Sequence, residues 1–466
     1  MFKSPRRRKP YSSFYNKNRN RRRVSPLWLM VSVPLLLIAL ELLAWILIGL
    51  TGKSAELAAY QGEPAIVTAY RLKFLTENKK PIAGLPDRGS LLAKKEIAVG
   101  YQLVGKQKTP FWQIGEQGFR DRDPLPLAKP KDEIRIFILG GSTTFGQWNQ
   151  NDENTIANQL EIRLKARVAQ QQSSPDKYRP DMMPIYWTEL VKAQALPTKI
   201  REGKYRVINA GVPGYTSGNQ LAQLAFQILP YKPDAIILLD GYPDVMLPSS
   251  ETAADIPRVG NFLGNAYGHL WAYLGSSFQQ WAEGTNFVKA VQYFWIKPQL
   301  SVAQKTLVFN WDNQPLGQYL AKDNGELERR VSRYRENHQQ IFRLSAATGI
   351  PVVVAVQPEI TGRPSSQLSK DEQAILQQLG KEYRDRFPKQ YDKFVQANLQ
   401  LAGAFPNTVK VINFYSLEQK FPVPAFSDAI HLREGANQAI AERLYREIAS
   451  WKEFQQVPKK ADRIKQ

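Results

Sequence analysis

The sequence predicts an α/β protein, a three-layer α/β/α sandwich built on a five-stranded parallel sheet and preceded by one N-terminal transmembrane helix. Five short segments are apolar and rich in Val and Ile, which is typical of strands buried on both faces. Segments with helical periodicity separate them, and this alternation implies right-handed crossovers between parallel strands. A long apolar run near the N-terminus is the basis for the transmembrane helix.

An N-terminal basic arm precedes the apolar run. Residues 1–24 contain ten Lys or Arg and no Asp or Glu, in a chain of net charge +21. The run, residues 27–50, is long enough to span a bilayer, and the positive charge before it predicts a cytoplasmic N-terminus. It is too long for a cleaved signal peptide, so we expect an uncleaved signal anchor with the C-terminal domain outside the cytoplasm. The position of the arm favours topology and lipid attraction over nucleic acid, and no nucleic-acid partner is expected.

Glu41 lies inside the apolar run, where a charged side chain is costly. Either it faces a partner helix, or it is protonated or reaches the nearer interface. The second interpretation is the simpler one and is slightly preferred.

The folded domain is expected to span residues 131–455, after the arm (1–25), the anchor (26–50) and a linker and approach segment (51–130), and before a basic tail (456–466). Its strands are predicted at 134–139, 205–209, 235–239, 351–356 and 408–414. Its helices are predicted at 156–168, 220–229, 326–348, 370–402 in two pieces, and 434–451. In the approach segment, residues 101–122 contain aromatic side chains that should pack against this domain.

Two inserts, 170–204 and 247–325, interrupt the alternation. The second carries four tryptophans: Trp271, Trp281, Trp295 and Trp311. Because it follows the third strand, it lies at the carboxyl edge of the sheet. A lid, an acyl-chain groove, a membrane-facing collar and a docking surface are all compatible with it.

Composition limits the chemistry. The chain has no cysteine, which excludes disulfides and thiolate metal sites. It has three histidines, so imidazole chemistry must use His269, His338 or His431. We expect His269 and His338 to be surface or packing residues, which leaves His431. A His-rich metal cluster is impossible, and neither a metal ion nor an organic cofactor is expected.

Ser142 stands at a sharp turn after the first strand. Gly140 and Gly141 end the strand, and a helical pattern begins at about residue 154. Open α/β sheets bind ligands at the carboxyl ends of their strands, so a hydroxyl group here is a candidate nucleophile. The alternative is that Ser142 only caps a helix, and the stretch by itself favours neither.

Asp428 and His431 follow the last predicted strand, three residues apart. A serine hydroxyl is a weak nucleophile until a base removes its proton, and the base needs a third group to fix its tautomer. This spacing brings the carboxylate near Nδ1 and leaves Nε2 to face Ser142. The alternative is that Asp428 caps the closing helix and His431 is an interfacial residue. Together with Ser142, the pair favours a Ser-His-Asp triad.

Three motifs resemble those of the SGNH/GDSL hydrolases, over roughly residues 131–450. They are LGGSTTFG at 139–146, INAGVPGY at 208–215 and DAIH at 428–431, with Gly141 where the family name has Asp. The resemblance implies a flavodoxin-like sheet and ester hydrolysis, or sometimes acyl transfer. It makes Ser142 the nucleophile and Asp428 and His431 the other triad members. The backbone N–H groups of Ser142 and Gly211 would then form the oxyanion hole.

One block departs from that family. Where the family has an Asn that donates its side chain to the oxyanion, this chain has Pro243, which has neither a side-chain donor nor an N–H. Losing one such donor lowers a rate by about 100- to 1000-fold. Asn149, Asn219 and Gln357 are candidates to replace it. Asp244, in the same block, is expected to accept backbone hydrogen bonds in a structural role.

The sequence therefore predicts a membrane-anchored, extracytoplasmic serine esterase that hydrolyses an acyl ester of a small molecule, a lipid or an envelope glycan. One alternative is an acyltransferase that acts on an envelope glycan with the same triad. The other is a catalytically weak envelope-binding or assembly protein, for which Pro243 and the tryptophan-bearing insert are the reasons.

Overall fold

The computed structural model describes residues 26–52, 91, 93–96, 99–108, 111–250, 285–291, 294–295, 316–416 and 421–460. The basic arm, His269, and Trp271, Trp281 and Trp311 of the second insert lie outside the described residues. The chain divides into two units. One comprises Met1–Gly62 and Gln279–Lys297, and the other comprises Glu63–Phe278 and Pro298–Gln466.

A five-stranded parallel sheet forms the centre of the larger unit, in the order β10-β9-β8-β5-β7. Its strands are β5 (Glu133–Gly140), β7 (Lys204–Asn209), β8 (Ala235–Asp240), β9 (Val352–Val356) and β10 (Val409–Asn413). This confirms the predicted sheet. The chain leaves β5 to β7 on one side and returns to β8 on the other, so the connections diverge beside β5. Such a switch point opens a crevice at the carboxyl ends of the strands.

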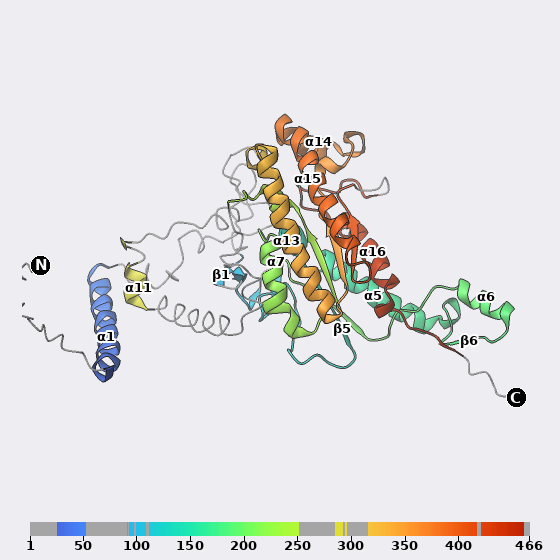
Figure 1. Cartoon of the computed structure of the whole chain (residues 1–466), viewed down its shortest axis with the longest axis horizontal. Helices are drawn as coiled ribbons and strands as arrows, with labels where there is room; N and C mark the ends of the chain where they lie inside the picture. Colours follow the sequence, from blue (N-terminus) through green and yellow to red (C-terminus); the bar gives the residue numbers. More distant parts are fainter. Residues whose placement is uncertain are drawn as a thin grey trace, which may run out of the picture. The chain divides into compact units, whose positions relative to one another are not determined.

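Helices cover both faces of the sheet and make three layers, as predicted (Figure 1). On one face lie α5 (Ile156–Ser173) and α16 (Glu434–Ser450). On the other lie α7 (Ser217–Gln223) and α13 (Asn324–Thr348), joined by the end of α15 (Gly380–Gly403), which follows α14 (Lys370–Gln378). Two short helices, α4 (Ser142–Phe145) and α8 (Tyr242–Met246), follow directly after β5 and β8.

Side chains of β5 alternate between the two faces. Ile136 and Ile138 join the core under α5 and α16, whereas Phe137 and Leu139 join the core under α7 and α13. All six residues of the central strand β8 are buried. A strand covered on both faces is apolar at most positions, which is why these segments could be recognised in the sequence.

The approach segment forms two antiparallel hairpins, β1 (Ala93–Glu96) with β2 (Gly100–Leu103) and β3 (Gln107–Lys108) with β4 (Gln113–Ile114). The ring of Trp112 packs edge-on against Phe145, with 6.3 Å between centroids, and Phe119 packs against Phe137 at 5.8 Å. The predicted packing of this segment against the main fold is therefore confirmed.

The first insert contains elements that the sequence pattern did not predict. They are β6 (Met182–Met183) and α6 (Trp187–Ala195), and β6 pairs in parallel with β11 (Lys459–Lys460). Short 3₁₀ turns cover Pro175–Lys177, Leu229–Tyr231, Leu316–Tyr319, Ile360–Gly362, Ser365–Gln367 and Lys452–Phe454, and a π turn covers Leu224–Ile228. Two of the residues expected in a frayed basic tail, Lys459 and Lys460, are thus held by the insert.

The smaller unit contains α1 (Pro26–Leu50) and α11 (Asn286–Val291). Glu41 Oε1 accepts hydrogen bonds from the backbone N and side-chain Nδ2 of Asn286, both at 2.8 Å, and Oε2 accepts one from Phe287 N at 2.9 Å. Glu41 therefore faces a partner helix, and the preferred interpretation from the sequence was wrong. In the described part of the chain, no helix combines the length and the hydropathy needed to cross a membrane. The transmembrane helix accordingly stays a prediction.

Candidate active site

Ser142 begins α4, immediately after the two glycines that end β5. The backbone of Gly211, in the second motif segment, packs closely against this turn. A Cβ on Gly211 would lie 2.4 Å from Phe145 N and 2.8 Å from the carbonyl carbon of Thr144. Only glycine permits that approach of the second block to α4, so the two motif segments meet backbone to backbone.

The three predicted triad residues meet at this turn, although Ser142 lies far from Asp428 and His431 in the sequence. Ser142 Oγ lies 2.8 Å from His431 Nε2, and His431 Nδ1 lies 2.6 Å from Asp428 Oδ2. The imidazole is nearly buried, with 5% of its side chain exposed, while 23% of the Asp428 side chain is exposed. These distances are those of a hydrogen-bonded relay from hydroxyl to imidazole to carboxylate.

The ionisation state of Asp428 decides where the protons lie in the hydrogen-bonded chain from Ser142 through His431 to Asp428. Burial would raise the pKa of this carboxyl, but the neighbouring charge of His431 and hydrogen bonds from the imidazole and from the backbone N–H groups of His431 and Ile430 hold it at about 2. Asp428 is therefore ionised at neutral pH and can only accept. The proton between Asp428 and His431 then resides on Nδ1, which leaves the Nε2 lone pair facing Ser142.

The local backbone explains why a three-residue spacing works. Asp428 Oδ1 accepts hydrogen bonds from Ile430 N at 3.0 Å and His431 N at 2.8 Å, so the carboxylate closes the turn that carries the histidine. The alternative in which Asp428 caps the closing helix does not hold, because the N-cap residue of α16 is Arg433.

A side-chain bridge fixes the histidine turn against the serine turn. Thr143 Oγ1 donates to Ile430 O at 3.1 Å and accepts from Gln357 Nε2 at 2.9 Å. Thr144 Oγ1 donates to Leu239 O at 3.1 Å, which ties α4 to the end of β8. The two threonines that follow Ser142 thus hold the nucleophile's turn in register with the last block.

Arg120 also organises the serine turn, although no chemistry could be assigned to it from the sequence. Its buried guanidinium donates to Phe145 O at 2.7 Å and to Gly146 O at 2.9 Å, and its Nε pairs with Asp152 at 2.7 Å. An arginine in a loop is usually read as a surface residue, so only its contacts reveal this role.

The expected oxyanion donors are the backbone N–H groups of Ser142 and Gly211. Gly211 N donates to Asn209 Oδ1 at 3.0 Å, so it already has a partner. Pro243 is the second residue of α8, and its Cγ would lie 3.5 Å from a Cβ placed on Gly141. The proline therefore faces the serine turn, at the place where the family's Asn would donate.

The three amides suggested as substitutes each donate to a group of the scaffold. Asn149 Nδ2 donates to Asn154 O at 3.2 Å, and Asn219 Nδ2 donates to Val99 O at 2.8 Å. Gln357 Nε2 donates to Thr143 Oγ1, as described above. Replacement of the missing Asn by one of these amides stays a prediction.

Behind the site lies a second, fully buried polar cluster. His338 Nε2 lies 2.9 Å from Asp240 Oδ2, and His338 Nδ1 lies 2.7 Å from Asn398 Oδ1. One ring nitrogen thus faces a carboxylate oxygen and the other an amide oxygen. Burial lowers the pKa of His338, but the charges of Asp240 and Asp244 and the hydrogen bonds from the ring to Asp240 and Asn398 outweigh it, so the pKa is raised. His338 is a packing residue, one of the two roles expected for it.

Asp244 has the structural role expected from the sequence. Its carboxylate accepts from Ser217 N at 2.9 Å and from Ser217 Oγ at 2.6 Å, which joins α8 to the start of α7.

In the described residues, no group of three or more His, Asp or Glu side chains is placed to hold a metal ion.

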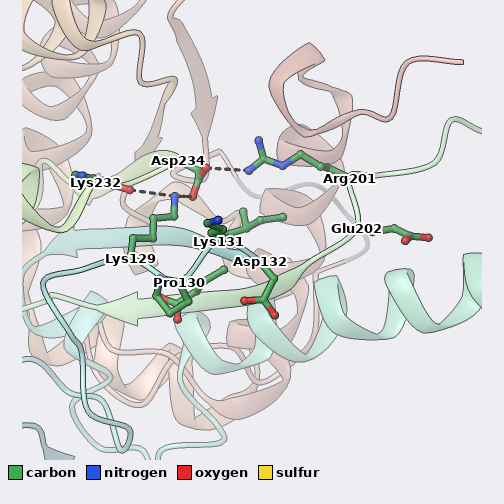
Figure 2. A pocket seen from close by; sticks show the side chains of 10 residues that line it. Lys129, Pro130, Lys131, Asp132, Arg201, Glu202, Lys232 and Asp234 are labelled. Carbon is green, nitrogen blue, oxygen red and sulfur yellow. Dashed lines mark hydrogen bonds and ion pairs between the residues drawn. The ribbon is translucent and has the colours of Figure 1, made fainter. Parts of the chain in front are cut away.

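A depression of about 460 Å³ lies at the other end of β5 (Figure 2). Asp234 pairs there with Lys129 and, at 2.8 Å, with Arg201, so the charges in the depression largely satisfy one another. It is lined by Lys129, Pro130, Lys131, Asp132, Glu133, Ile134, Arg201, Glu202, Lys232 and Asp234. Because Ser142 follows the carboxyl end of β5 and this depression lies at the amino end, it cannot hold a molecule that reacts with Ser142.

No protein-family model matches the chain, and no curated protein matches it. Among solved structures, a lipase/acylhydrolase from Enterococcus faecalis aligns with a TM-score of 0.34 and 14% identity, over 70% of this chain and 100% of that chain. The acetyl xylan esterase AlAXEase aligns with a TM-score of 0.34 and 11% identity, over 68% of this chain and 100% of that one. A catalytic mutant of the acetylxylan esterase Axe2 from Geobacillus stearothermophilus aligns at 0.33 and 11%, over 69% and 96%.

Proposed function

We propose that the chain is a serine ester hydrolase of the SGNH/GDSL type, with Ser142 as nucleophile, His431 as general base and Asp428 as the residue that orients the base. The single observation that carries this proposal is the relay of 2.8 Å and 2.6 Å from Ser142 Oγ through the imidazole to Asp428. The motif resemblance in all three segments supports the same assignment. Neither argument depends on the low-scoring structural likenesses.

In the proposed reaction, Ser142 Oγ attacks the ester carbonyl while His431 Nε2 takes the hydroxyl proton. The alcohol then leaves with that proton, and an acyl group stays on Ser142. A water molecule then attacks the acyl carbon while its proton passes to Nε2. The bond between the acyl carbon and Ser142 Oγ breaks, Oγ takes the proton back from Nε2, and the carboxylic acid is released. Asp428, held ionised by its pKa of about 2, stabilises the imidazolium in both halves.

The oxyanion of each tetrahedral intermediate would be held by the backbone N–H groups of Ser142 and Gly211. Gly211 N would have to turn from Asn209 Oδ1 to the oxyanion, or share its hydrogen between them. With Pro243 in place of a side-chain donor, the hole is weaker than a three-donor hole. We therefore infer a slow esterase.

The same proline favours a second candidate, a catalytically weak envelope-binding or assembly protein. Changing Pro243 to Asn tests whether the missing donor limits the rate of a working esterase. If the missing donor limits a working esterase, turnover of an ester should rise by about 10-fold or more, against the 100- to 1000-fold that one donor contributes in an optimised site. Initial rates with p-nitrophenyl acetate, with circular dichroism as the check on folding, provide the measurement. A folded variant that is no faster than wild type would mean that this position does not limit the rate.

Hydrolysis itself is tested with Ser142→Ala. Wild type should hydrolyse p-nitrophenyl acetate, and the variant should fall to the rate of buffer, because no other hydroxyl stands next to His431 Nε2 in the described site. Ser217→Ala is the matched control, since Ser217 Oγ also contacts a carboxylate but lies in the buried cluster around Asp244. Equal rates for wild type and Ser142→Ala would contradict the proposal. Adding sugar acceptors and measuring transfer against release distinguishes the acyltransferase alternative.

We further propose that residues 26–50 anchor the chain in a membrane, with the folded domain on the extracytoplasmic side. The basic arm and the apolar run support this, as do large apolar side chains exposed on α1, such as Leu35 at 60% and Trp45 at 68%. An anchored enzyme would act on acyl esters of lipids or envelope glycans. Retention of the full chain in membranes after an alkaline carbonate wash tests the anchor.

A further inference from the structure

Trp148 is the residue in contact with the triad that the sequence did not single out. It follows α4 in the turn that begins at Gly146. Its indole Nε1 lies 2.8 Å from Asp428 Oδ2 and 3.1 Å from His431 Nδ1. The indole and imidazole rings meet edge to face, with 6.0 Å between centroids and 90° between planes. A third side chain thus reaches the bond between base and carboxylate.

The backbone at Trp148 is held in an unfavourable conformation. Its φ is +72°, in the left-handed region that bulky side chains rarely adopt. The turn is closed by Gly146 N, which donates to Ser142 O at 3.0 Å, and by Gln147 N, which donates to the same oxygen at 3.0 Å. Arg120 also holds this turn, by donating hydrogen bonds to Phe145 O and Gly146 O. Strain of this kind persists where the surroundings impose it, and it clusters at functional sites.

The indole N–H has two acceptors within reach, and only one is compatible with the relay. Asp428 is ionised, and the proton between it and His431 is on Nδ1, so Nδ1 has no lone pair to offer. The indole therefore donates to Asp428 Oδ2, the same oxygen that accepts the imidazole N–H. One carboxylate oxygen is shared by two donors.

We propose that Trp148 is a positioning residue of the triad, whose indole N–H holds Asp428 and, by sharing its charge, limits how strongly that carboxylate stabilises a protonated His431. This rests on the proposed function for its catalytic meaning, but not for its physical test. A hydrogen bond to a carboxylate draws negative charge from it, and the neighbouring imidazolium gains less from what is left. Since the indole and the imidazole share Oδ2 of Asp428, less of that oxygen's negative charge is left to stabilise a protonated His431 than if the imidazole were its one donor.

The other charged and titratable groups around the pair leave this effect to Trp148. Tyr242 of α8 is electrostatically coupled to Asp428, but its burial raises its phenol pKa far above neutrality, so it stays uncharged. Arg433 follows on the same turn, where it donates to Phe426 O at 3.2 Å and lies 3.9 Å from Asp371. Glu434 accepts from Asn154 at 3.0 Å.

The test is the NMR titration of the histidine ring signals in the full chain, wild type against Trp148→Phe. The chain has three histidines, and the His431 signal is identified by its loss in His431→Gln. Removing the indole N–H should raise the titration midpoint of His431 by about 0.5 to 1 pH unit, because Asp428 Oδ2 then accepts from the imidazole alone. The matched control is Trp112→Phe. This substitution also removes an indole, but one that packs on Phe145, so the midpoint of His431 should stay unchanged.

A folded Trp148→Phe variant with the wild-type midpoint would overturn the inference, as would an equal shift in Trp112→Phe. Should the phenylalanine variant fail to fold, site-specific incorporation of benzothienylalanine at position 148 removes the N–H and keeps the bicyclic ring. Because the midpoint is measured without a substrate, it separates this inference from the proposed function. A shifted midpoint in a protein that hydrolyses no ester would support the Trp148 contact and contradict the proposed esterase activity.

Discussion

Replacing His431 by alanine is expected to lower ester hydrolysis by about 10⁴-fold while the fold stays intact. The reason is that Ser142 Oγ has its proton acceptor only 2.8 Å away, at Nε2 of this ring. Without it, the hydroxyl must lose its proton to water. The measurement is the initial rate with p-nitrophenyl acetate across pH 5 to 9, alongside far-UV circular dichroism.

The control for that loss is a variant of the same turn that keeps the relay. Glu434→Gln removes a charge that contacts only Asn154 in the described residues, so its rate should stay within about twofold of wild type. A His431→Ala protein that is folded and retains a tenth or more of the wild-type rate would show that another base serves Ser142.

Replacing His338 by leucine is expected to destabilise the larger unit by about 3 to 5 kcal/mol, because it leaves the buried carboxylate of Asp240 without its counter-charge. Both side chains are completely buried, and Tyr334 OH donates to the second oxygen of Asp240 at 2.9 Å. Urea unfolding followed by circular dichroism at pH 6 gives the free energy of unfolding.

The pH dependence of this loss has a definite sign. The pKa of His338 is raised in the folded protein, so the contribution of its charge is fully present below the unfolded value of about 6.5 and is lost as pH rises through the folded value. The difference in stability between wild type and His338→Leu should therefore shrink at alkaline pH. The double variant Asp240→Asn with His338→Leu should lose less than the single variant, since it leaves no buried charge unpaired. A double variant as unstable as the single one would mean that packing, and not charge, explains the loss.

The strands of the sheet could be predicted because burial on both faces makes their sequences nearly continuous apolar runs. β8 begins with the five apolar residues AIILL, and a short apolar run between helical patterns is typical of a strand buried on both faces. The long helices had both periodicity and end signals: Asp323 accepts from Glu326 N at the start of α13, and Gly349, with φ +69°, ends it. The strands β6 and β11 could not be predicted, because two-residue strands have no period to detect.

At the site, the residues that could be predicted were those with a chemical type and a motif, Ser142, Asp428 and His431. The residues that could not were recognised only by contact. Trp148 reaches the triad through a backbone angle that no sequence pattern reports, and Arg120 acts through carbonyl oxygens of a distant turn. The acceptors of Asn149, Asn219 and Gln357 are likewise known only from their contacts, because a position near a motif does not report where an amide donates.

The most direct measurement for the account is peptide mapping of the full chain after reaction with a fluorophosphonate, a reagent that phosphonylates activated serine hydroxyls. The account predicts one adduct per chain, on Ser142, formed more slowly by at least about 100-fold in His431→Ala. A folded wild-type protein that takes no adduct at Ser142, or takes it equally fast without His431, would contradict the claim that this hydroxyl is activated by the imidazole beside it.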